Sequence, residues 1–444
     1  MSPGPQGAPG TPREHRAERG TAQTPPAPAH WRLRWLLTAP HRLAFFGAGL
    51  VFAASAVWWF GALWSRLDGW PLAWMVSPTL AHSLLMSFGF MPLFFAGFLF
   101  TAGPKWLAQP EMRASALAPT VGAALAGWAL FVPGVNLSTL LAAIGLAVAA
   151  AGWGIFTLRL WRLVRTSRVR DRTHPRWVGA ACAIGALAMW AAAAGLAAQR
   201  EDIVRAAVQL GLWGFIALVF ATVAHRMIPF FGDGGLARLD LRWPGWLLWV
   251  FGATLGLQAA FGMTDALAGP AGASGHALRA ALEAPSALLL VALALRWVAI
   301  PRLRIPLRQR LPRMMYIGFA WFALALALAT VSDALAAFGD GSVALGLAPL
   351  HAMTMGFLGS ILLAMTSRVA CGHSGRSQVA DAFLWSLFWL LQTAVLARLA
   401  SAAWPALPSF VLLFAALAWA GVATAWALRY GRWFGRPRPD GRPG

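Results

Sequence analysis

Long uninterrupted apolar runs constrain this chain more than any other feature of its sequence. Residues 43–64 and 140–158 contain no Asp, Glu, Lys or Arg, and a helix of about 20 residues crosses a hydrocarbon core of about 30 Å. Hydrophobic residues make up 59% of the chain and charged residues 11%, whereas a soluble domain typically carries about 25% charge. A membrane β-barrel would show alternating segments of about ten residues instead. The sequence therefore predicts an all-α, polytopic transmembrane bundle.

The apolar runs and the basic loops between them predict the number of spans and their orientation. An amino terminus on the cytoplasmic side places most of the 36 Lys and Arg residues in cytoplasmic segments, as the positive-inside rule requires. Only Arg66, Arg200, Arg205 and Arg279 then fall outside. The carboxyl terminus is also expected to be cytoplasmic. The twelve predicted spans are 43–64, 78–103, 115–133, 136–160, 177–198, 206–231, 243–264, 277–300, 314–337, 346–370, 380–400 and 409–428.

The two ends of the chain are predicted to be basic cytoplasmic tails. Residues 1–42 begin with a stretch rich in Pro, Gly, Ala and charge that cannot bury a core, so we expect a disordered segment. A cleavable signal is not expected, because the first apolar run starts near residue 43 and is long enough to span. Residues 429–444 form the second tail, and 43–428 form one membrane domain of about twelve helices.

Composition and motifs exclude several functions. The net charge of +21 comes from basic residues in loops between spans, so it indicates membrane orientation and no nucleic-acid partner. The two cysteines, Cys182 and Cys371, form neither a disulfide framework nor a haem-attachment motif. Walker loops, nucleophile elbows and zinc-protease motifs are missing from the sequence.

Ionisable residues within spans are costly and are therefore candidates for function. Among the histidines, His15, His30, His41 and His174 are expected in solvated tails or loops, and His276 at an outer span end. Within or at the inner ends of spans lie His82, His225, His351 and His373.

Two of these histidines share a local pattern. His82 precedes Met86, and His351 precedes Met355, by four residues, so each imidazole and thioether lie on one helix face. Imidazole with thioether suits haem iron or Cu(I). Alternatively, each histidine bonds a neighbouring carbonyl, and the methionines serve for packing.

The other two histidines, His225 and His373, lie near the inner ends of their spans and predict a second, inner pair. Arg226 and Arg368 lie beside this inner pair, where guanidinium groups either contact haem propionates or reach the interface. Cys371 either joins an inner metal site or serves as a small apolar residue.

Further charges are predicted inside the membrane. Glu283 and Asp333 are expected in the middle or outer part of their spans, where carboxyl groups can carry protons. Arg296 and Arg398 are two more buried charges.

Three segments resemble the NnrS family, membrane proteins associated with haem, copper and the bacterial response to nitric oxide. The first runs from His82-Ser-Leu-Leu-Met-Ser-Phe-Gly-Phe to Ala96-Gly-Phe-Leu-Phe-Thr-Ala-Gly-Pro-Lys-Trp106. The second is Arg226-Met-Ile-Pro-Phe-Phe231. The third runs from Leu350-His-Ala-Met-Thr-Met-Gly356 to Met365-Thr-Ser-Arg-Val-Ala-Cys-Gly-His-Ser-Gly-Arg376.

The resemblance implies that His82, His351 and His373 are metal ligands. The sequence departs from the family pattern at Leu84 and Leu85, which stand where the pattern has a second His and a Glu. This difference removes two polar groups from the outer site. His225 stands where the pattern has Gly and is a candidate replacement ligand.

Together these features predict a multi-pass protein of the bacterial inner membrane. We expect it to bind haem, of b type, with copper as a second metal, and to act in the response to or protection from nitric oxide, a small diatomic ligand. One alternative is a copper or small-molecule transporter or a metal-insertion factor. Another is a relative of respiratory oxidases or nitric-oxide reductases, although those carry a tightly spaced His-His pair that this sequence lacks.

Overall fold

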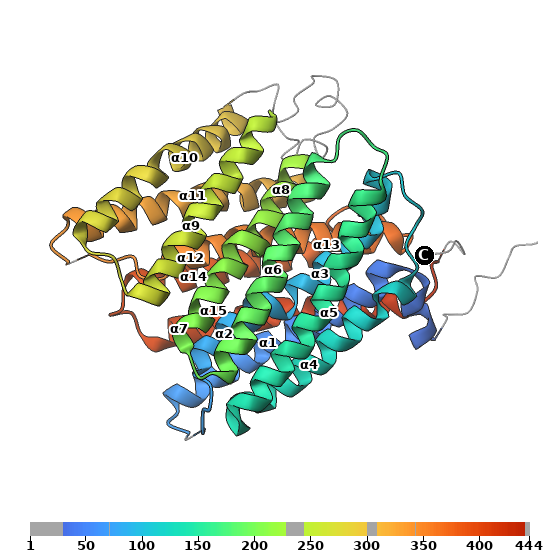
Figure 1. Ribbon diagram of the computed structural model, residues 1–444, viewed down its shortest axis with the longest axis horizontal. Helices are drawn as coiled ribbons and strands as arrows, with labels where there is room; N and C mark the ends of the chain where they lie inside the picture. Colours follow the sequence, from blue (N-terminus) through green and yellow to red (C-terminus); the bar gives the residue numbers. More distant parts are fainter. Residues whose placement is uncertain (1–29, 71, 228–243, 300–308, 342, 440–444) are drawn as a thin grey trace, which may run out of the picture. The chain divides into compact units, whose positions relative to one another are not determined.

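The computed structural model describes residues 30–70, 72–227, 244–299, 309–341 and 343–439, with only the backbone of 297–299. Every regular element in these ranges is a helix (Figure 1), and they contain no strand. A helix closes its own backbone hydrogen bonds, which is what a segment surrounded by hydrocarbon requires. The predicted all-α class is therefore confirmed.

Twelve helices within the described ranges are long and apolar enough to cross a membrane. Large apolar side chains cover the outer surface of the bundle, including Leu158 at 73% exposure and Leu288 at 69%. Such a surface is unfavourable in water and suits contact with lipid tails. Because twelve is an even number, these described spans would begin and end on the same side of a membrane, which is what the predicted topology requires.

Nine of these spans are single α-helices, one of which begins with a short 3₁₀ segment, η3 (Ala114–Leu117). They are α1 (Pro40–Leu67), α4 (Ala118–Leu137), α5 (Thr139–Thr166), α6 (Thr173–Ala197), α9 (Gly245–Ala268), α10 (Ala273–Ala299), α11 (Arg310–Phe338), α14 (Ala382–Ala403) and α15 (Ser409–Phe434).

The other three spans each consist of a short α-helix, a π-helical segment and a second α-helix. The spans are α2 (Pro78–Leu84), η2 (Leu85–Gly89) and α3 (Met91–Trp106); α7 (Glu201–Gln209), η4 (Leu210–Ala217) and α8 (Leu218–Met227); and α12 (Ala348–His351), η8 (Ala352–Gly359) and α13 (Ser360–His373).

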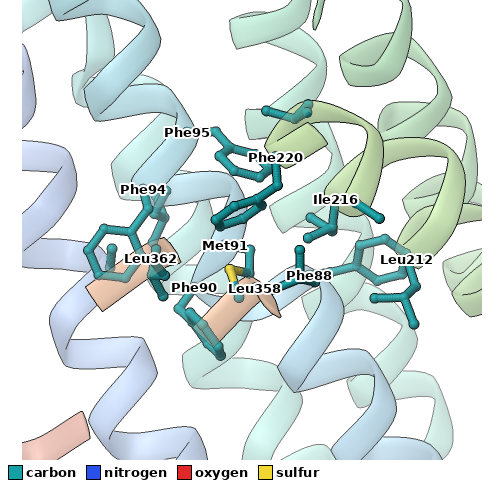
Figure 2. Packing of buried hydrophobic residues seen from close by; sticks show 14 of the residues in the cluster. Phe88, Phe90, Met91, Phe94, Phe95, Leu212, Ile216, Phe220, Leu358 and Leu362 are labelled. Atoms are coloured by element: carbon teal, nitrogen blue, oxygen red, sulfur yellow. The ribbon is translucent and has the colours of Figure 1, made fainter. Parts of the chain in front are cut away.

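These three spans form the centre of the bundle. In the most apolar 18-residue window of each, 83%, 83% and 67% of the residues are buried, compared with 50% or less in the other nine. Their side chains meet in one apolar cluster (Figure 2), in which Phe88, Met91, Ile216 and Leu358 lie together. Gly211 allows the closest approach, because a Cβ atom there would lie 2.3 Å from the Phe88 ring.

The helices extend beyond the predicted boundaries at both ends of the membrane domain. A 3₁₀-helix, η1 (Leu33–Thr38), precedes α1, which begins at Pro40 because proline suits the first helical turn. At the other end α15 continues past residue 428 to Phe434, and Tyr430 and Phe434 are buried. Residues 1–29 and 440–444 of the predicted tails lie outside the described residues.

Small residues allow α4 and α5 to pack with their backbones in contact. A Cβ atom on Gly145 of α5 would lie 2.5 Å from the Gly127 carbonyl oxygen and 2.6 Å from the Phe131 nitrogen. Without a hydrophobic effect between helices in lipid, such close packing supplies much of the association energy. Gly154, on the same helix, has no atom within 4 Å of its Cβ position.

Replacing Gly145 with alanine should destabilise the bundle by about 1–3 kcal/mol, because the methyl group overlaps backbone atoms that cannot move away easily. The matched Gly154→Ala change should leave stability unchanged or raise it slightly, since alanine has the higher helix propensity. Thermal unfolding of the two variants in detergent measures the difference. Equal melting temperatures would show that the α4–α5 contact is looser than described.

Candidate functional site

A cavity with a volume of about 500 Å³ lies at the predicted outer ends of the spans. All three π-helical segments contribute to its wall, through Met86 of η2, Leu212 of η4 and Met355 of η8. A π-helix displaces side chains from the regular helical stripe and often occurs at functional sites. The cavity is within the range of pockets that bury cofactors and drug-sized ligands.

His82 enters this cavity from α2. The helix begins at Pro78 and is capped by Ser77, whose hydroxyl oxygen accepts a hydrogen bond from the backbone of Leu80 at 3.3 Å. The His82 ring stacks on Trp59 of α1, with ring centroids 3.9 Å apart. Its Nδ1 atom is buried and has no hydrogen-bond partner in the described structure. A buried nitrogen without a partner is costly, and this one is free to bind a ligand in the cavity.

His351 reaches the same cavity from the end of α12. Its Nδ1 lies 2.9 Å from the carbonyl oxygen of Leu347. A carbonyl can only accept, so Nδ1 carries the proton and the neutral ring keeps its lone pair on Nε2. A backbone carbonyl that fixes the tautomer in this way is the usual support of a metal-binding histidine. The carbonyl bond that the sequence offered as an alternative to metal binding is thus present at His351, and it leaves Nε2 free to bind a ligand.

Three methionine side chains contribute to the apolar part of the wall. Both methionines of the predicted pairs, Met86 and Met355, line the cavity together with His82 and His351, and Met91 adds a third thioether. The structure thus brings the two histidines and two methionines of the predicted outer site to one cavity. Met91 could not be singled out from sequence, because its position after η2 depends on the π-helical turn.

Four polar side chains from three other helices line the rest of the wall. They are Arg398 of α14, Asp265 of α9, and Arg205 and Gln209 of α7. Arg205 also pairs with Glu201 at 2.9 Å. Asp265, Gln209 and Trp59 carried no distinguishing sequence signal, since each belongs to a different span and only folding brings them together. Arg205 was predicted in the outer loop, and the structure places it within α7.

An apolar layer, whose side chains are labelled in Figure 2, lies on the inner side of the cavity. Phe94 and Phe95 of α3, Phe220 of α8 and Leu362 of α13 lie about one helical turn deeper than the cavity wall, and each is at most 6% exposed. Two spaces next to this layer have volumes of only about 10 and 40 Å³. The layer separates the outer cavity from the polar groups at the inner end.

The predicted inner histidine His225 pairs with a residue that we expected to be solvated. His174 lies in the first turn of α6, and its Nε2 is 3.0 Å from Nδ1 of His225. The other nitrogen of His225 lies 3.2 Å from the carbonyl oxygen of Pro244. Since the carbonyl accepts, His225 donates from Nε2 and His174 donates to Nδ1 of His225. The expectation of a solvated His174 was therefore wrong.

His373 likewise has an unexpected neighbour. Its ring lies 4.4 Å from the ring of His41, centroid to centroid. His41 is 1% exposed, because α1 starts at Pro40 and its first turn is covered by the end of α13 and by α15. The prediction that His41 is solvated was wrong. The two inner histidines of the sequence prediction thus lie in two separate histidine pairs.

The two arginines predicted beside the inner histidines have different surroundings. The Arg226 guanidinium lies over the Trp106 ring at 5.0 Å. Nearby, the backbone N–H of Thr173 donates to Asp171 at 3.0 Å and lowers the pKa of that carboxyl group, so it stays ionised opposite this arginine. Arg368 is partly buried on α13. Residues 228–231 of the second sequence motif lie outside the described residues.

The donor set of the outer cavity fits a haem or a Cu(I) ion better than a hard or structural metal. The described residues contain no group of three or more His, Cys, Asp or Glu side chains placed to hold an ion. Two imidazoles with thioethers are instead a soft set. Leu84 and Leu85, which replace the two polar residues of the family pattern, are 0% and 1% exposed and pack in the core. His82 and His351 are therefore the residues that would supply nitrogen ligands to a soft metal or haem in this cavity.

The fold and the site define a polytopic helical membrane protein with a His/Met-lined cavity at one end of its bundle. The model of the NnrS family, described as NnrS protein, matches residues 35–438. The chain therefore belongs to the NnrS family. A comparison with curated proteins found no match.

Single cysteines should report on which side of the membrane the cavity lies. Thr79 lines the cavity and Ser377 follows α13 at the opposite end, and both are exposed. A membrane-impermeant maleimide added to intact spheroplasts should label Thr79→Cys and not Ser377→Cys. The native cysteines are buried, with exposures of 0% and 8%, so the background should be low. Labelling of Ser377→Cys alone would reverse the predicted orientation.

Proposed function

We propose that this NnrS-family protein binds haem in its outer cavity, with Cu(I) as a second metal, and acts in the bacterial inner membrane in the response to or protection from nitric oxide. The observation that carries the proposal is the pairing of His82 and His351 on one cavity. One has a buried nitrogen without a partner, and the other has a tautomer fixed for binding through Nε2. Family membership supports the link to nitric oxide.

The chain's own residues would hold and shield the cofactor. His82 and His351 would bind the metal through ring nitrogens, and the Trp59 stack holds the His82 plane in place. Arg398, which also lines the cavity, would pair with an acidic group of the cofactor. Haem iron, when bound, would supply the affinity for a diatomic ligand, which would take the place of one of the two histidines.

The apolar layer favours a binding protein over a transporter. A transported ion would have to cross Phe94, Phe95, Phe220 and Leu362, where the remaining spaces of about 10 and 40 Å³ are at most a little larger than one water molecule. Crossing this layer would leave a charge without polar partners, at a cost of several kcal/mol. The two ends of the bundle therefore act as separate sites.

Removal of either outer histidine should release the cofactor. In His82→Ala and His351→Ala, the ratio of Soret absorbance to protein should fall by at least about tenfold, because loss of even a supporting group of a metal ligand typically costs 10–100-fold in affinity. Met86→Leu and Met355→Leu should lower bound copper and keep the Soret band, since leucine fills similar space without sulfur. Absorption spectra and elemental analysis of the purified proteins measure both quantities.

His30→Ala is the control for these substitutions, because His30 is exposed at the start of the described chain. It should retain the wild-type spectrum and metal content. Purified wild-type protein without a Soret band, iron or copper would refute the proposal. Copper uptake that depends on His82, in protein that lacks haem, would favour the transporter instead.

Cells that lack this protein should grow poorly with a nitric-oxide donor and recover when the wild-type chain is restored. The double variant His82→Ala/His351→Ala, present in the membrane at the same level, should not restore growth, because it lacks both nitrogen ligands. Growth delay after addition of the donor is the measurement. Equal protection by the double variant would show that the nitric-oxide response does not depend on this cavity.

A further inference from the structure

A network of charged side chains joins α9, α10 and α11 beside the outer cavity. Arg279 is 9% exposed and binds Asp265 through two hydrogen bonds of 2.6 and 2.7 Å. His276 lies 2.6 Å from Asp333. His276 lies at a span end, as predicted, but its side chain is only 22% exposed and is bonded to this carboxylate. The arginine and the histidine each have an acidic partner.

Glu283 is the remaining carboxyl group and has no cationic partner of its own. It is 3% exposed, and Oε1 accepts a hydrogen bond of 2.7 Å from the Gln258 amide. Oε2 is buried without a partner in the described structure. Its charged neighbours are Asp333 of α11, which repels a carboxylate, and Arg279 of α10, whose two Nη atoms are already bound to Asp265.

The charge balance determines the protonation state of Glu283. An ionised Glu283 would leave a buried negative charge opposite a neutral amide, and such a charge is far more costly than a neutral group. A protonated Glu283 leaves only a neutral hydroxyl group without a partner, at a cost of about 1–3 kcal/mol. A metal cation is a poorer occupant, because hard cations need about six oxygen ligands and Glu283 offers one unpartnered oxygen.

The network also borders the cavity. Asp265 lines the cavity wall, as does Gly262, which lies one helical turn after Gln258 on α9. Gln209 contacts α9 at Gly262, where a Cβ atom would lie 2.6 Å from the Gln209 Oε1 atom. Asp265 therefore belongs both to the cavity wall and to the charged network around Glu283.

We propose that Glu283 is a proton-binding residue of this membrane domain, protonated in the resting protein and able to release its proton when the charge in the neighbouring cavity changes. The release breaks the Glu283 O–H bond and transfers the proton to water, which leaves a carboxylate near Arg279. The groups that set this equilibrium are Asp265 on α9, His276 and Arg279 on α10, and Asp333 on α11. The protonated resting state goes beyond the proposed function and does not depend on a bound cofactor, whereas the release of the proton rests on the proposed function, through the charge that a cofactor brings into the cavity.

Infrared spectroscopy of the full-length protein in nanodiscs at neutral pH tests the proposal. The wild type should show a carboxylic-acid C=O band that shifts in D₂O and is lost in Glu283→Gln, whose amide keeps the size of the side chain. Glu111→Gln, which changes an exposed loop carboxylate, should keep the band. Identical spectra of the wild type and Glu283→Gln would overturn the proposal.

Gln258→Leu provides a second test, should Glu283→Gln fail to fold. Loss of the amide that bonds Oε1 should move the C=O band to higher frequency, because the carbonyl then lacks its hydrogen bond. A band that stays in place would assign it to another residue and overturn the proposal. A wild-type band that appears only after sodium is removed would identify a cation site and also overturn it.

Discussion

Within a bilayer every backbone amide must find its hydrogen bond inside the protein, and the rest of this structure depends on that constraint. The twelve spans of the described residues satisfy this constraint through backbone hydrogen bonds within each helix. The π-helical segments meet it with a wider turn, which changes the direction of the side chains without leaving backbone groups unpaired. All three segments lie on the central spans and line the same cavity. The helical geometry that provides the backbone hydrogen bonds therefore also shapes the cavity.

Polar groups in the bundle follow a consistent arrangement. Those at the outer end converge on the His82/His351 cavity or on the neighbouring Glu283 network, and those at the inner end form the His174–His225 and His41–His373 pairs. The apolar layer around Phe94 and Phe220 lies between the two levels. This separation gives each end its own electrostatic environment and supports a bound cofactor at the outer level.

Much of the fold could be predicted from sequence because hydrophobicity and charge act locally. The apolar run 43–64 and the basic loops around it indicate a span and its direction without reference to the rest of the chain. Helix ends were harder to predict from sequence. Helix α1 begins at Pro40, before the predicted boundary, and His41 in its first turn is therefore buried. The pairs His82/Met86 and His351/Met355 could be recognised from the sequence because the two members of each pair lie four residues apart on one helix. The contacts of His225 with His174 and of Glu283 with Gln258 join different helices, and a single sequence holds no signal for them.

An electron cryo-microscopy map of the protein purified from its native membrane tests the central claim most directly. The account predicts density for a haem in the cavity between His82 and His351, with a ring nitrogen of at least one of these histidines on the iron. A map in which the cavity holds only lipid or detergent, or in which a metal lies at the inner histidine pairs and none at the outer cavity, would contradict it.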